Sequence, residues 1–243
     1  MKCFFCKRVD STNLEGRRII RRDKPEDSFW VIADDQYAGK GHCNSQWESE
    51  SGMNFTASLV FFPDKLEAFR QFQISKLLSL GLADFLELYL ENVRIKWPND
   101  LYINDQKIAG ILIENEIIGE WISVSIMGIG VNINQTIFRS DAPNPVSLCD
   151  LTGIEMDLSE TSSLIRSRVE NRLELMHSGL SKDVDQEYLR KLFRYKEFAP
   201  FKTEDRWIEA RIIEIGEFGE LILEEKSGKS RSFGFKEVEF ILP

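Results

Sequence analysis

The chain has 243 residues, of which 42% are hydrophobic and 29% charged, and its formal net charge at pH 7 is −9. This length allows one sizeable α/β domain with a small second domain, and the acidic balance argues against a general nucleic-acid-binding protein. No run of about 18 uncharged apolar residues occurs, and the N-terminus lacks the apolar core of a signal peptide. A cytoplasmic protein without a membrane segment is therefore expected.

Residues 2–9 have the composition of a strand, and the polar run Asp10-Ser11-Thr12-Asn13 follows it. These are residue types that begin helices, and Thr12 stands three residues before Glu15, the spacing of a capping box. The run has a second interpretation, because hydroxyl and amide groups beside a helix N-terminus can also bind a polar ligand. The sequence position of these residues does not distinguish helix capping from ligand binding.

A second strand is predicted at 28–34, and the loop at 36–47 follows it with Gly39, Lys40 and Gly41 at its centre. Two glycines around a lysine suggest a backbone that accommodates phosphate, although a solvated loop has the same composition. A dinucleotide-binding motif is excluded because the third glycine is missing. A Walker A motif is excluded because no Ser or Thr follows Lys40.

Residues 53–62 alternate apolar and small polar side chains, which predicts a half-buried strand. Residues 64–92 predict a long helix or a pair of helices with an apolar face. Residues 93–114 then predict a hairpin, formed by two apolar runs that meet at a turn over 104–106.

The hairpin contains charged groups that an apolar strand pair does not need. Lys96 and Lys107 lie within it, and a buried lysine is costly unless an anion meets it. Asp100 and Asn99 follow the first run, and Gly110 removes a side chain where a ligand or a second backbone could approach. The alternative is that Lys107, which adjoins the turn, simply points into solvent.

A strand at 121–126 continues into 127–134, where Gly128 and Gly130 precede Asn132. This spacing suits close packing against a ligand, with the Asn132 amide able to pair with the edge of adenine, or it marks a bend of the sheet. Residues 135–158 are rich in loops, and helices are predicted at 159–178 and 182–196.

The tail changes character, with short strands predicted at the end of the chain and glycines between them. This pattern predicts a small β-barrel, and it divides the chain into domains at 1–196 and 197–243. The predicted strands are 207–215, 221–225, 231–235 and 238–242.

The segment KWPNDLY followed by KIAGILIE resembles the core signature of biotin protein ligases, which attach biotin to carboxylase carrier domains. The Ser-Thr-Asn at 11–13, the glycine-containing loop that ends in Trp47, and the Gly-x-Gly-x-Asn at 128–132 extend the resemblance. It implies an α+β fold with a mixed or antiparallel sheet and packed helices, similar to class II aminoacyl-tRNA synthetases, and a C-terminal SH3-like β-barrel. There is no room before Asp10 for the helix-turn-helix of repressor members, so a short form without a DNA-binding domain is expected.

The resemblance also implies an enzyme that forms biotinyl-5′-AMP from biotin and ATP with Mg²⁺, and then transfers biotin to a lysine of a carrier protein. Lys107 and Asp100 are the expected catalytic residues, and Asp100 is also the expected metal anchor. Biotin is expected to contact Ser11, Thr12, Asn13, Gln36, Gly39, Lys40, Gly41, Lys107 and Gly110. The nucleotide is expected to contact Lys40, His42, Trp47, Lys96, Asn99 and Asn132.

The loop departs from the family pattern, since Lys40, His42 and Cys43 stand where arginines are usual. Lysine keeps a positive charge but lacks the bidentate fork of arginine. Two other functions stay open: a ligase for lipoate or octanoate on the same fold, and a non-catalytic module that binds biotin or a nucleotide. A homodimer that pairs through strand edges is a further open alternative.

Overall fold

The computed structural model describes residues 1–41, 45–140, 144–176 and 182–242. Within them, a larger sheet has seven strands in the order β1-β2-β3-β7-β6-β5-β4. β1 runs parallel to β2 and the other neighbours are antiparallel, so the predicted mixed sheet is confirmed. The strands are β1 (Lys2–Val9), β2 (Phe29–Gln36), β3 (Phe55–Phe61), β4 (Val93–Lys96), β5 (Asp100–Ile103), β6 (Gln106–Ile118) and β7 (Trp121–Val131).

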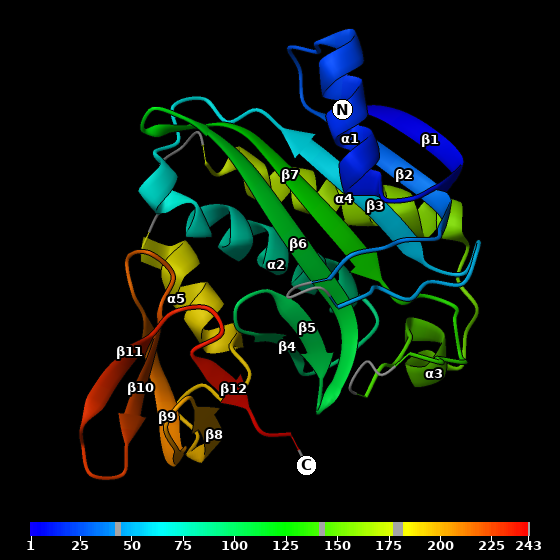
Figure 1. The fold of residues 1–243 in the computed structure, drawn as a ribbon. Helices are drawn as coiled ribbons and strands as arrows, with labels where there is room; N and C mark the ends of the chain where they lie inside the picture. Colours follow the sequence, from blue (N-terminus) through cyan, green and yellow to red (C-terminus); the bar gives the residue numbers. More distant parts are fainter. Residues whose placement is uncertain (42–44, 141–143, 177–181, 243) are drawn as a thin grey trace.

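The helices cover both faces of this sheet (Figure 1). Successive side chains of β2 point to opposite faces of the sheet. Phe29 and Val31 pack with Ile19 of α1 on one face. Trp30 and Ile32 lie on the other face, in the larger core that includes residues of α2 and α4. The helices are α1 (Thr12–Asp23), α2 (Phe72–Leu86), α3 (Leu148–Thr152), α4 (Leu158–Glu174) and α5 (Lys182–Lys191), with a 3₁₀ turn η2 (Ala68–Arg70). None of the described helices is long and apolar enough to cross a membrane.

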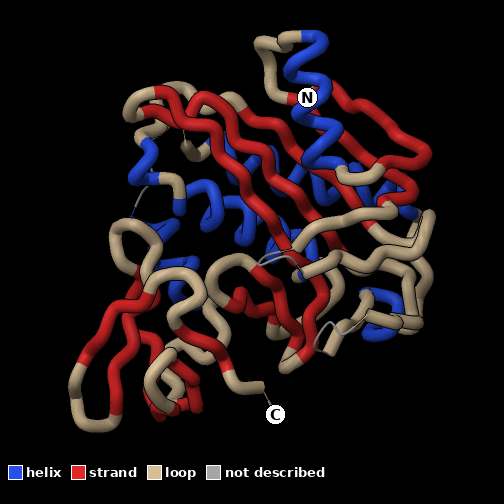
Figure 2. The backbone as a smooth tube through the Cα atoms, in the orientation of Figure 1, coloured by secondary structure: helices blue, strands red, loops and turns tan. Residues whose placement is uncertain are grey.

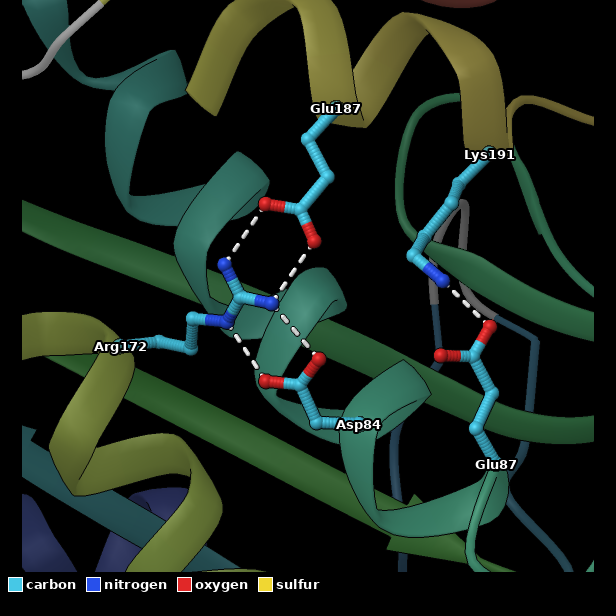
Figure 3. Close-up of polar contacts among 5 residues, drawn as sticks. All are labelled: Asp84, Glu87, Arg172, Glu187 and Lys191. Atoms are coloured by element: carbon cyan, nitrogen blue, oxygen red, sulfur yellow. Dashed lines mark hydrogen bonds and ion pairs between the residues drawn. The ribbon is translucent and has the colours of Figure 1, made fainter. Parts of the chain in front are cut away.

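A charged cluster links α2, α4 and α5 to one another (Figure 3). Arg172 of α4 donates to the Asp84 carboxylate of α2 at 2.6 and 2.7 Å, and to the Glu187 carboxylate of α5 at 2.8 Å. Lys191 of α5 pairs with Glu87, which follows α2. Because the guanidinium is partly buried, these paired contacts fix the angles between the helices more firmly than a solvated ion pair would.

The predicted hairpin at 93–114 is wrong in one respect, because the segment forms three strands with two turns. Pro98 has no backbone N–H to continue β4, so the chain turns at residues 97–99 before β5. The second turn lies at Asn104, whose φ is 53°, and it leads into β6. Asp100 thereby lies opposite Lys96, and Tyr102 opposite Lys107.

The tail forms a second, antiparallel sheet in the order β11-β10-β9-β8-β12. Its strands agree with those predicted, except that β8 was not foreseen, and its fold is consistent with an SH3-like barrel. Its core residues, such as Phe201 and Leu221, are continuous with the core of the larger sheet. The strands are β8 (Ala199–Thr203), β9 (Trp207–Ile215), β10 (Leu221–Glu225), β11 (Ser230–Phe233) and β12 (Val238–Phe240). The division at residue 197 stays a prediction.

Candidate active site

A cavity of about 920 Å³ opens beside β6 and β7. Long loops gather at one end of the larger sheet (Figure 2). The structure brings nearly all the predicted site residues to this cavity. Gly39 is not among its lining residues, and His42 lies outside the described part of the chain. Those that line it are Ser11, Thr12, Asn13, Gln36, Lys40, Gly41, Trp47, Lys96, Asn99, Asp100, Lys107, Gly110 and Asn132.

The start of α1 does not form the predicted capping box between Thr12 and Glu15. Ser11 is the N-cap and makes no side-chain capping bond. The Thr12 N–H and hydroxyl both donate to Gln36 Oε1, at 2.9 and 3.2 Å, and the Glu15 carboxylate pairs with Arg18 instead. The polar groups at the start of the helix therefore face the cavity, and this favours the ligand-binding interpretation of the sequence.

Two residues that sequence reasoning missed orient Asn13. Ser58 Oγ of β3 lies 2.5 Å from Asn13 Oδ1 and 2.7 Å from Thr12 Oγ1. The Asn13 amide donates to Glu114 of β6 at 2.8 Å. Gly128 makes this arrangement fit, because a Cβ there would lie 2.6 Å from Asn13 Oδ1. The only hint in the sequence is that small polar residues alternate along the strand at 53–62.

The glycine-containing loop folds back on itself and carries Trp47 onto the sheet. The Gly41 N–H donates to Ser45 O at 2.7 Å, and the Trp47 N–H donates to Gly39 O at 3.0 Å. The Trp47 indole then lies against the paired Gly110 and Gly130, where added Cβ atoms would fall 2.9 and 2.2 Å from the ring. The close approach predicted at Gly110 is therefore made by a side chain of the same protein.

Lys96 and Lys107 are two of the lysines that line the cavity, and both have defined partners. The Lys107 ammonium donates to Asp100 at 2.7 Å and lies 5.7 Å from the centre of a Trp47 ring. Burial lowers the pKa of Lys96, whose ammonium lies between the rings of Tyr102 and Phe240 at 5.0 and 5.5 Å. Neither lysine simply points into solvent, so the alternative considered for Lys107 is wrong.

Asparagine amides line the same cavity. Asn132 donates to Val146 O at 3.1 Å, and within the described residues its buried side-chain oxygen has no partner. That oxygen, rather than the amide nitrogen, is the group available to the amino group of an adenine. The Asn99 amide donates to Ile111 O at 3.1 Å.

The small sheet also contributes to the cavity, which the sequence did not indicate. Phe235 and Phe240 line it, and the Phe235 ring stacks on Trp97 with centroids 5.2 Å apart. The Trp97 indole donates to Gly219 O at 2.9 Å, and the Tyr188 hydroxyl donates to Pro98 O at 2.8 Å. The turn before Asp100 is thus held by both parts of the chain.

Solved structures of biotin protein ligases share this fold. The chain is similar to the biotin protein ligase from Aquifex aeolicus in complex with biotin and ATP, with a TM-score of 0.81, 22% identity, and coverage of 98% of this chain and 97% of that one. It is also similar to the ligase from Leishmania major in complex with biotinyl-5-AMP, with a TM-score of 0.66, 18% identity, and coverage of 96% and 98%. These likenesses confirm the predicted fold class.

Sequence comparison assigns the family. The chain belongs to the biotin/lipoate A/B protein ligase family, whose model matches residues 5–132. It is 34% identical over 165 residues to the biotin–[acetyl-CoA-carboxylase] ligase of Paracoccus denitrificans, over 65% of this chain and 67% of that protein. It is also 34% identical over 132 residues to the bifunctional ligase/repressor BirA of Escherichia coli, of which the match spans 40%. The resemblance noted in the sequence is confirmed.

Proposed function

We propose that this chain is a biotin protein ligase, which activates biotin with ATP as biotinyl-5′-AMP and transfers it to a lysine of a biotin carboxyl carrier domain. One observation carries the proposal. A single cavity contains the polar groups of residues 11–13, the Lys107–Asp100 pair and the open oxygen of Asn132. The family assignment and the names of its relatives support the same reaction.

In the first step an oxygen of the biotin carboxylate attacks the α-phosphorus of ATP, and the bond to the β-phosphate breaks to release pyrophosphate. Both reactants are anionic, and two like charges near 4 Å repel by about 4 kcal/mol at an effective dielectric of 20. Lys107, which Asp100 holds at 2.7 Å, is the cation proposed to bridge the carboxylate and the α-phosphate. Lys40 and Lys96 would neutralise the neighbouring phosphate charge.

The polar and aromatic groups would then position the two substrates. Ser11, Thr12 and Gln36 would bind the ureido ring of biotin, because the Ser11 hydroxyl and the Gln36 amide line the same part of the cavity and Thr12 holds Gln36 Oε1 in place. Asn132 would accept from the adenine amino group, and Trp47 would cover the ligand with its ring.

In the second step the amine of the carrier lysine attacks the carbonyl carbon of the mixed anhydride. An amide bond forms, the amine loses a proton, and AMP leaves with the bonding electrons. AMP is a good leaving group, so the protein chiefly has to keep water from the anhydride until the carrier docks. The loop at 36–47, which carries Trp47 onto the sheet, is the segment proposed to do this.

Mg²⁺ is proposed to assist through Asp100. A magnesium ion usually binds one or two carboxylates together with substrate phosphates, so the Asp100 carboxylate, which lines the cavity, fits such a role. The described residues contain no cluster of three or more His, Cys, Asp or Glu that would hold a metal without the nucleotide. When bound, the ion would neutralise triphosphate charge. A cytoplasmic location and a homodimer likewise remain proposals.

Biotin-dependent exchange of labelled pyrophosphate into ATP tests the function, run in parallel with lipoate and octanoate and followed by transfer to a purified carrier domain. Exchange with biotin alone, and biotin on the carrier lysine by mass spectrometry, is the expected result. Exchange with lipoate or octanoate instead would assign the chain to the other branch of the family. Binding of biotin without any exchange would indicate a non-catalytic module.

A further inference from the structure

Glu48 joins two loops that are distant in the sequence. It directly follows Trp47, and its carboxylate accepts from the backbone N–H of Arg139 at 2.9 and 3.0 Å and of Ser140 at 2.7 Å. The Gln135 side chain donates to the same carboxylate at 3.3 Å. The Glu48 side chain, directly after the loop at 36–47, thus accepts hydrogen bonds from three residues of the segment 135–140, which follows β7.

The carboxylate is held in its charged form. Burial alone would raise the pKa of Glu48, but the hydrogen bonds from Ser140, Arg139 and Gln135 outweigh it and lower the pKa below its usual value. Hydrogen bonds to an ionised acceptor are about twice as strong as those between neutral groups. The hydrogen bonds of Glu48 therefore hold the two loop segments together more strongly than hydrogen bonds between neutral groups would.

The segment 135–140 forms part of the cavity wall, since Phe138 and Ser140 line it. It is also fastened on either side of Arg139 and Ser140. At its start, Gln135 Oε1 accepts from Asn54 at 2.6 Å. Beyond it, the backbone of Lys107 pairs with residues 144–146, with the Lys107 N–H donating to Asn144 O at 2.8 Å. Among the described residues, Glu48 supplies the attachment between these two points.

We propose that Glu48 is a positioning residue that couples the loop over biotin to the segment 135–140 on the nucleotide side, so that binding of either ligand strengthens binding of the other. The inference rests on the proposed function, because it takes biotin and ATP as the two ligands. Its physical basis is the connection from Trp47 through the Glu48 carboxylate to the N–H groups of Arg139 and Ser140, which follow Phe138 in the chain. When Trp47 settles on a ligand, Glu48 carries the two N–H donors, and with them Phe138, into a fixed place.

The coupling is a free energy between two binding events, so it is reciprocal and measurable by titration. The biotin dissociation constant is measured with and without saturating α,β-methylene ATP, an analogue whose α–β bond does not break. For the wild type we expect nucleotide to tighten biotin binding by about fivefold or more. For Glu48→Ala the ratio falls to near one, while the dissociation constant for biotin alone changes by less than about threefold.

Two further variants separate this role from a loss of charge or of fold. Glu48→Gln keeps one acceptor oxygen and should give an intermediate ratio. If Glu48→Ala does not fold, Glu48→Gln alone decides the test. Glu50→Gln is the matched control, because it removes the same charge from the same loop, and within the described residues the Glu50 carboxylate has no hydrogen bond or ion pair. Its ratio should equal that of the wild type.

The outcomes distinguish the inference from the function beneath it. A wild-type ratio near one, an unchanged ratio in Glu48→Ala, or an equal loss in Glu50→Gln would each overturn the coupling. If the wild type still exchanges pyrophosphate with biotin in any of these cases, the proposed function stands. A wild type that binds no biotin would refute the proposed function, and the coupling would fall with it.

Discussion

Replacing Gly130 by alanine should impair ligand binding without destabilising the protein. The added Cβ would lie 2.2 Å from the Trp47 indole, far inside the contact distance of two carbon atoms, so the ring has to leave the sheet. Forcing an extra methyl group into a packed site costs about 1–3 kcal/mol. Because the Trp47 ring is a wall of the cavity, this cost corresponds to roughly fivefold to 150-fold weaker binding of biotin or ATP.

The fold should tolerate the same change. Gly130 is not among the glycines with positive φ, so its backbone can accept alanine, and the atoms that the new methyl group meets belong to the Trp47 ring. If the ring moves away, thermal unfolding should give a melting temperature close to that of the wild type, while the KM values in pyrophosphate exchange rise.

A double-mutant cycle identifies the cause. If the clash with Trp47 is responsible, Gly130→Ala should add little to the loss already present in Trp47→Ala. Wild-type KM values in Gly130→Ala would refute the reasoning. So would an equal further loss when the alanine is introduced into the Trp47→Ala background, because the methyl group would then act on something other than the ring.

Two stability predictions concern ion pairs. Arg172→Leu should lower the free energy of unfolding by about 2–3 kcal/mol in urea titrations, because it leaves the Asp84 and Glu187 carboxylates partly buried without their cation. This loss is smaller than the loss expected for a fully buried pair. A loss under about 0.5 kcal/mol would contradict the prediction. A hydrogen bond from Arg18 holds the pKa of Asp10 at about 2. The contribution of this pair to folding stability is therefore fully present above the unfolded-state pKa near 4, and it is lost as the pH falls toward 2. The stability difference between wild type and Asp10→Asn should therefore shrink across that range, and a constant difference would count against the pairing.

The candidate residues that local patterns marked carry an unusual local cost, and the resemblance to biotin protein ligases then gave them their expected roles. Lys96 and Lys107 were recognisable because lysines in apolar strands need an anion, and the structure places Asp100 beside Lys107. Gly110 was recognisable because a glycine within a strand marks a close approach. In each case the residue type and its immediate neighbours in the sequence are enough to show the cost, which is a buried charge for the lysines and a missing side chain for the glycine.

Other features depend on contacts between distant segments. Thr12 had the spacing of a capping box, but Gln36, 24 residues away, takes its N–H and hydroxyl. Glu48 is 91 residues from Arg139, and as a glutamate in a polar loop it has no local signal. Such long-range pairing follows from the order of strands in the sheet, which local patterns do not specify.

The most direct test of the account is biotin-dependent pyrophosphate exchange by Lys107→Ala, compared with the wild type and with Lys7→Ala. Lys7 is exposed on β1, and within the described residues its side chain has no hydrogen bond or ion pair. Removing one preorganised electrostatic group from an active site typically costs about 10²–10³ in rate. We predict a loss of at least about a hundredfold in Lys107→Ala with wild-type exchange in Lys7→Ala. Exchange within about threefold of wild type in Lys107→Ala would contradict the central role of Lys107.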